Sequence, residues 1–240
     1  MGPGLIKAVL FDFGQTLVDS AQGFRRAEKT AQAKLLADLR RSRPNLPRSA
    51  FMERYRELRR RFQIHSDFSR CNLWSAVAGA FGTPIAGQRL QQWELAYWQT
   101  VAGQTRIFVE APHVLKRLGA VYRLGLVTNT QGQPAAATHR LRHFPELASW
   151  FDAIVVAGCD GIPAKPDPLP FQICLERMGL APADAVYVGD DWRIDVCGAG
   201  AAGLKTVWIK HRSVQRRWPD VDTAGVPVIA DLNGLWDVLV

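Results

Sequence analysis

The chain has 240 residues, of which 48% are hydrophobic and 22% charged, and its formal net charge is +8. This apolar fraction excludes a disordered or fibrous protein, and no apolar run reaches the roughly 18 residues that a membrane-spanning helix needs. The first residues lack the pattern of a secretory signal, and the four cysteines form no CxxC pair. We therefore expect a cytoplasmic protein with reduced thiols and no membrane association.

A short apolar run at residues 5–11 opens the chain and is typical of a strand that is buried on both faces. Similar runs recur later, at residues 122–127, 153–156, 185–188, 206–209 and 226–229. Helix-like stretches such as 112–118 and 168–178 separate them. Strands that alternate with helices predict a doubly wound parallel α/β sheet of five or six strands.

Residues 20–106 differ from this pattern because their apolar residues recur at helical spacing. One stripe consists of Phe51, Tyr55, Leu58 and Phe62. The segment also holds 16 basic residues against 6 acidic ones, so it carries the positive charge of the chain. We predict an all-helical insert at residues 18–107, and an α/β core made of residues 1–17 and 108–240.

Polar residues follow the predicted strands, in the loops at their ends. They are Asp12, Thr128 with Asn129, Lys165 and Asp190. All strands of a parallel sheet point one way, so these positions meet at the edge where open α/β sheets bind ligands. The sequence therefore predicts one site that combines carboxylates, a lysine and a hydroxyl.

These residue types indicate phosphoryl transfer. Neighbouring carboxylates such as Asp12 and Asp190 repel each other unless a cation lies between them, and oxygen ligands favour Mg²⁺. An aspartate can attack a phosphoryl group as a nucleophile, while an ammonium and a hydroxyl hold the phosphoryl oxygens. The expected partner is a small phosphorylated metabolite.

Four segments together resemble the motifs of the haloacid dehalogenase-like (HAD) hydrolases. They are FDFGQTLVDS (11–20), LVTNT (126–130), AKPDPLPF (164–171) and VGDDWRIDVCGAGAAGLKTVW (188–208). Their order and spacing match the family, and the helical insert resembles the C1 cap of the phosphoglycolate phosphatase-like subfamily. The resemblance implies a Rossmann-like core with a cap domain.

The resemblance also implies a role for each matching residue. Asp12 matches the nucleophile, which also binds Mg²⁺, and Lys165 matches the lysine that steadies nucleophile and phosphate. Thr128 and Asn129 match the phosphate-binding positions. The metal ligands implied are Asp12, the carbonyl of Gly14 and Asp190, with Asp195 and Asp191 in support.

One position departs from the family pattern DxDGT, because this chain reads Asp12-Phe13-Gly14-Gln15-Thr16. The missing second aspartate is the residue that protonates the leaving group in the family, a contribution of about 10²–10⁴-fold. Three readings stay open. The protein is a phosphatase that works with another acid, with water or on a good leaving group; or it cleaves C–Cl or C–P bonds; or it has lost turnover and serves as a binding or regulatory protein.

Several features of the sequence help to choose among these three hypotheses. Displacement of a halide needs no cation, and the relatives that catalyse it lack the carboxylate matched by Asp190. Cleavage of C–P bonds uses a cap lysine, but Lys29 and Lys34 stand in no recognisable context. His65 is a candidate for the missing acid. We therefore favour an Mg²⁺-dependent phosphatase with an aspartyl-phosphate intermediate on Asp12.

Two further patterns are read as structural. Residues 198–203 match GxGxxG, but no strand directly precedes them and no helix follows, so a dinucleotide site is not expected. The arginine run between Arg54 and Arg61 lies opposite an apolar stripe, which indicates a solvated helix face rather than a nucleic-acid site. The sequence leaves open whether the protein forms a homodimer.

Overall fold

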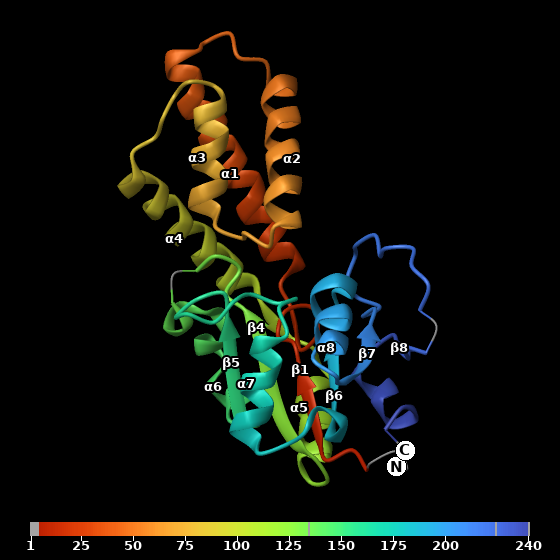
Figure 1. The fold of residues 1–240 in the computed structure, drawn as a ribbon. Coiled ribbons are helices and arrows are strands. Elements are labelled where there is room, and N and C mark those ends of the chain that lie inside the picture. The colour runs from red at the N-terminus through yellow and green to blue at the C-terminus, as the bar shows by residue number, and fades with distance from the viewer. Residues whose placement is uncertain (1–4, 134, 224, 240) are drawn as a thin grey trace. The chain divides into compact units, whose positions relative to one another are not determined.

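The computed structural model describes residues 5–133, 135–223 and 225–239. The chain divides into two compact units, one of Met1–Ala21 with Arg106–Val240 and the other of Gln22–Thr105 (Figure 1). The second unit is shorter than the predicted insert of residues 18–107. The reason is a small antiparallel pair, β2 (Val18–Asp19) and β3 (Arg106–Ile107), which belongs to the first unit.

The first unit is built on a six-stranded sheet with the order β5-β4-β1-β6-β7-β8, and all its strand pairs are parallel. The predicted doubly wound parallel sheet is therefore confirmed. The strands are β1 (Ala8–Phe11), β4 (Arg123–Asn129), β5 (Ala153–Ala157), β6 (Ala185–Gly189), β7 (Lys205–Ile209) and β8 (Val228–Ile229).

Helices cover both faces of this sheet, as alternate side chains of the central strand show. Val9 and Phe11 belong to an apolar cluster with α5 (Ala111–Gly119). Ala8 and Leu10 belong to another cluster, which includes residues of α7 (Leu169–Met178) and α8 (Gly198–Ala201). Because β1 is buried on both faces, it is apolar throughout, and its carboxyl end holds a fixed place at the centre of the sheet.

The second unit is helical. Its helices are α1 (Ala21–Ser42), α2 (Arg48–Ile64), α3 (Arg70–Ala80) and α4 (Gly87–Gln104). The first residue of α1, Ala21, still belongs to the first unit. The predicted stripe from Phe51 to Phe62 packs in the apolar core of this unit, where the Trp74 indole donates to the Tyr55 hydroxyl at 3.4 Å. The unit thus has a core of its own.

Shorter elements complete the first unit. They are α6 (Pro145–Ala148), 3₁₀ turns at Ala136–Thr138, Arg140–His143, Pro182–Asp184 and Leu232–Asp237, and a π-helical turn at Trp192–Cys197. All four cysteines are free. Among the described residues, no helix is both long and apolar enough to cross a membrane.

Candidate active site

The carboxyl ends of the central strands bring the predicted polar residues to one edge of the sheet. Asp12 directly follows β1. Thr128 and Asn129 are the last two residues of β4, not residues beyond it as predicted, because they pair with Val156 and Ala157 of β5. Lys165 lies in the segment between β5 and α7.

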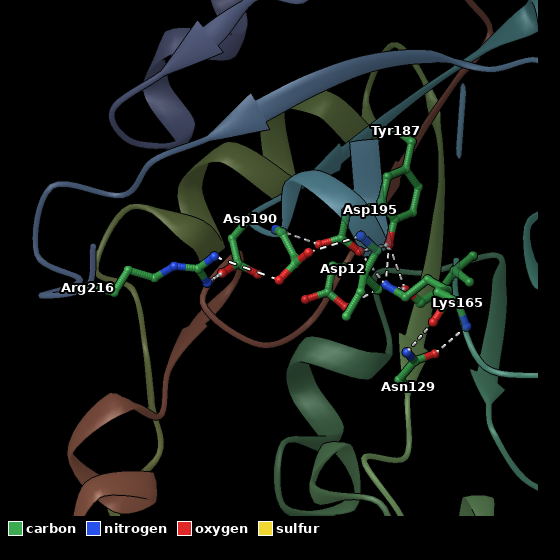
Figure 2. A network of polar contacts seen from close by, with 10 residues as sticks. Asp12, Asn129, Lys165, Tyr187, Asp190, Asp195 and Arg216 are labelled. Carbon is green, nitrogen blue, oxygen red and sulfur yellow. Dashed lines mark hydrogen bonds and ion pairs between the residues drawn. The ribbon is translucent and has the colours of Figure 1, made fainter. Parts of the chain in front are cut away.

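Lys165 is the centre of a buried polar network (Figure 2). Its ammonium lies 2.9 Å from Oδ1 of Asp12 and 2.7 Å from Oδ1 of Asp195. It also lies 2.7 Å from the Tyr187 hydroxyl and 2.9 Å from the Val127 carbonyl. Burial alone would lower the pKa of Lys165, but the two carboxylates more than offset it and raise that pKa, so the side chain stays a cation.

Two neighbours fix the position of this lysine. The Asn129 amide accepts from the Lys165 backbone N–H at 2.8 Å and donates to its carbonyl at 3.1 Å, which ties the Lys165 segment to the end of β4. The Tyr187 hydroxyl donates to the Val127 carbonyl at 2.8 Å. Burial, followed by the charge of Asp195, raises the pKa of Tyr187 well above its ordinary value, so the phenol remains protonated.

Three carboxylates form a cluster that can hold a metal ion. One oxygen each of Asp12, Asp190 and Asp195 lies within 4.8 Å of the others, and all three residues are buried. Burial, then repulsion from the neighbouring carboxylates, raises the pKa of Asp190 well above its ordinary value, although Arg216 opposes the rise. The same causes raise the pKa of Asp195 to about 6, against the effect of Lys165. A cation bound between these carboxylates would favour their ionised forms.

An arginine supplies positive charge at one side of this cluster. Arg216, in the segment after β7, forms an ion pair with Oδ2 of Asp190 and lies 3.8 Å from Oδ2 of Asp191 (Figure 2). The Trp208 indole donates to the backbone carbonyl of Asp190 at 2.9 Å and fixes the chain there. Arg216 therefore stands where it can balance the charge of Asp190.

Close packing places Asp195 in the network. A Cβ added to Gly189 would stand 2.4 Å from Cβ of Asp195, so only glycine fits at the end of β6. Oδ2 of Asp195 accepts from the Asp191 backbone N–H at 2.9 Å. The Asp191 carboxylate accepts from the Ile194 N–H at 3.0 Å and caps the π-helical turn.

The predicted residues are not all joined by these contacts. Among the described residues, the Thr128 hydroxyl makes no hydrogen bond to the network around Lys165, although Thr128 is buried at the end of β4. Gly14 lies in the loop after β1, where a Cβ would stand 4.0 Å from Oδ2 of Asp12. The Gly14 position therefore lies beside the Asp12 carboxylate.

Sequence reasoning missed Tyr187, Gly189 and Arg216. Tyr187 is the one polar side chain within an apolar strand, so its hydroxyl was hidden by the core pattern. Gly189 precedes Asp190 directly, and a glycine at the end of a strand was the available signal for a close approach. Arg216 lies in an irregular segment with no motif, and no sequence signal marks it.

Comparison with known proteins gives the family. The model of the family described as haloacid dehalogenase-like hydrolase matches residues 6–203. The chain therefore belongs to the haloacid dehalogenase-like hydrolases, as the four sequence segments predicted.

Individual relatives agree with this assignment. The chain is 27% identical to a glyceraldehyde 3-phosphate phosphatase of Pyrococcus abyssi, over 86% of this chain and 82% of the relative. It is 30% identical to the human N-acylneuraminate-9-phosphatase, over 89% of this chain and 86% of the relative. Among solved structures, a 2-haloacid dehalogenase of Pseudomonas syringae is 28% identical, with a TM-score of 0.64 over 98% of each chain.

Proposed function

We propose that this chain is a phosphatase that hydrolyses a small phosphorylated metabolite through an aspartyl-phosphate on Asp12. The observation that carries the proposal is the contact of Lys165 with Oδ1 of Asp12, at 2.9 Å, inside a buried carboxylate cluster. This contact leaves Oδ2 of Asp12 as the oxygen that attacks phosphorus. The relatives named as phosphatases support the same reaction class.

Each residue of the site has a task in this reaction. Lys165 holds Asp12 in one orientation and balances negative charge that gathers on the phosphoryl oxygens. Thr128 and the backbone N–H of Asn129 bind those oxygens at the end of β4. Asp195 and Tyr187 keep the Lys165 ammonium in place, because both accept from it at 2.7 Å.

The carboxylate cluster fits a hard divalent cation, and we propose Mg²⁺. Buried carboxylates with raised pKa values favour a bound cation, and oxygen donors are the ligands that Mg²⁺ prefers. Asp12, Asp190 and the Gly14 carbonyl would hold the ion, with Asp195 and Asp191 in support. When bound, the ion neutralises charge on the transferring phosphoryl group.

The helical unit is proposed to act as the cap that selects the substrate. It has an apolar core of its own, and residues 22–105 carry 15 basic residues against 6 acidic ones. This excess of positive charge favours the approach of anionic metabolites.

Two other functions are less well supported. A binding or regulatory protein without turnover is not favoured by relatives that are named as phosphatases. The likeness to a 2-haloacid dehalogenase would suit a chain that lacks the second motif carboxylate. However, displacement of halide needs no cation, and the buried cluster around Asp190 would then have no use.

Phosphate release tests the proposal. The substrates are p-nitrophenyl phosphate, acetyl phosphate and a panel of phosphorylated metabolites, each with Mg²⁺ or with EDTA. We expect release that needs Mg²⁺ and that Asp12→Asn abolishes. Asp220→Asn, an exposed acid outside the site, is the matched control and should keep the activity. No release from any of these compounds by the wild type would contradict the proposal.

A further inference from the structure

The space beside the nucleophile, where the family pattern has a second aspartate, is bordered by a buried arginine in this chain. A Cβ added to Gly14 would stand 3.4 Å from Nη2 of Arg140 and 4.0 Å from Oδ2 of Asp12. Lys165 bonds to Oδ1 of Asp12, so Oδ2 is the oxygen that faces this space. Nη2 of Arg140 and Oδ2 of Asp12 thus both lie within 4.0 Å of the same point.

Glycine is not required at this position for its backbone freedom. Gly14 is not among the residues with a positive φ, whereas its neighbour Gln15 adopts a φ of 62°. What distinguishes Gly14 is therefore the side chain that it lacks. The room left beside Asp12 lies next to the Arg140 guanidinium.

Arg140 is held in place within the same unit. It begins the 3₁₀ turn Arg140–His143 and is 2% exposed. Its Nη1 donates to the Ser20 hydroxyl at 2.5 Å, and its guanidinium carbon lies 5.5 Å from the centre of the Phe13 ring. A fixed cation away from water attracts an anion more strongly than a solvated one does.

An arginine cannot act as the general acid that the missing aspartate provides in the family. A guanidinium stays protonated in proteins, so it gives no proton to a leaving group, but it stabilises an oxygen that departs as an anion. An oxygen leaves in this form when its conjugate acid is strong. The chemistry beside Asp12 therefore suits acidic leaving groups.

We propose that Arg140 binds the departing oxygen, and that the substrate carries its phosphoryl group on an acidic oxygen, as acyl and enol phosphates do. This inference rests on the proposed phosphatase function and specifies its substrate class. Oδ2 of Asp12 forms a bond to phosphorus, the bond from phosphorus to the leaving oxygen breaks, and that oxygen keeps the electron pair beside Arg140. Water then attacks phosphorus, Asp12 is released, and both protons of the water leave with the product as dihydrogen phosphate.

A linear free-energy series tests the proposal. The substrates are aryl phosphates with leaving groups from p-nitrophenol to phenol, together with acetyl phosphate and an alkyl phosphate. For the wild type we expect kcat/KM to fall steeply as the leaving group becomes less acidic, with acetyl phosphate among the best substrates. For Arg140→Gln we expect a loss of about 10²–10³-fold on phenyl phosphate, as for removal of an oxyanion donor, and a smaller loss on acetyl phosphate.

Control variants separate this role from a structural one. Arg142→Gln removes an exposed arginine of the same turn and should leave the series unchanged. Arg140→Lys keeps the charge and should recover part of the loss on poor leaving groups, which a packing role would not produce. Ser20→Ala removes the 2.5 Å contact at Nη1 and serves as the milder change if Arg140→Gln does not fold.

The failures of the two proposals are distinct. If the wild type releases phosphate in an Asp12-dependent way, but Arg140→Gln lowers kcat/KM equally on all leaving groups or not at all, the role of Arg140 is refuted. If no substrate in the series, acetyl phosphate included, gives Asp12-dependent release, the proposed function itself fails.

Discussion

A buried histidine beside the site should make the stability of the protein depend on pH. His139 is 2% exposed, and its ring packs edge-on against Phe13 with centroids 5.4 Å apart. Burial, then the charges of Arg140 and Lys165, lowers the pKa of His139 to about 3. The folded protein therefore holds this imidazole neutral at a pH where the unfolded chain protonates it.

The sign and size of the effect follow from the two pKa values. The pKa of histidine in an unfolded chain is about 6.5. Between that value and about 3 the unfolded state binds one more proton than the folded state, so the free energy of unfolding falls as the pH falls. Above about pH 6.5 the contribution of His139 to the free energy of unfolding is fully present. At pH 5 this one group lowers the free energy of unfolding by about 2 kcal/mol relative to pH 7.

His139→Asn is the matched change. The His139 ring accepts from the Leu141 N–H at 3.2 Å as the cap of a 3₁₀ turn, and asparagine also accepts at such a position without titrating. Urea unfolding of both proteins at pH 7 and pH 5 measures the difference. The wild type should lose about 2 kcal/mol more than the variant between the two pH values. Parallel pH curves would refute the reasoning.

Three further changes test the contacts of the site. Tyr187→Phe removes an acceptor 2.7 Å from the Lys165 ammonium and should lower the free energy of unfolding by about 1–2 kcal/mol in urea; unchanged stability would count against the network. Gly189→Ala forces a Cβ into Asp195, so we expect a loss of about 1–3 kcal/mol; a neutral result would contradict the packing. Arg216→Gln removes the cation beside the carboxylate cluster, so Mg²⁺ should raise the melting temperature more than in the wild type; an equal rise would show that Arg216 does not compete with the ion.

The parts of the fold that were predictable are those with a strong local pattern. The continuous apolar runs mark the sheet because a strand covered on both faces has few polar residues. Helical spacing of residues such as Phe51 and Tyr55 marks the second unit, since both side chains are buried in its core. The pair β2 and β3 escaped prediction because two residues per strand are too few to show a period.

The site was predictable where residues end strands and not where they approach from elsewhere. Asp12 directly follows β1, and Lys165 lies in the loop after β5. The geometry of a parallel sheet brings the two side chains together. Arg140 and Arg216 come from irregular segments whose course depends on the tertiary structure. No period or spacing therefore assigns either arginine to the carboxylates.

The missing carboxyl at Gly14 was evident from the sequence, but its meaning was not. From the residues alone, an absent acid is compatible with a phosphatase that uses another acid, water or a good leaving group. It is also compatible with cleavage of C–Cl or C–P bonds, or with lost turnover. In the structure a guanidinium lies 3.4 Å from the point where the side chain would begin. From that contact we expect a substrate whose leaving oxygen is acidic.

The covalent intermediate is the most direct test of the account. Acetyl phosphate labelled in its phosphoryl group is mixed with the protein and Mg²⁺, quenched in acid within milliseconds to seconds, and the peptides are mapped by mass spectrometry. We predict a phosphoryl group on the peptide that contains Asp12, absent in Asp12→Asn and decaying as free phosphate appears. Release of phosphate with no label on Asp12 at any time, or with label on another residue, would contradict the account.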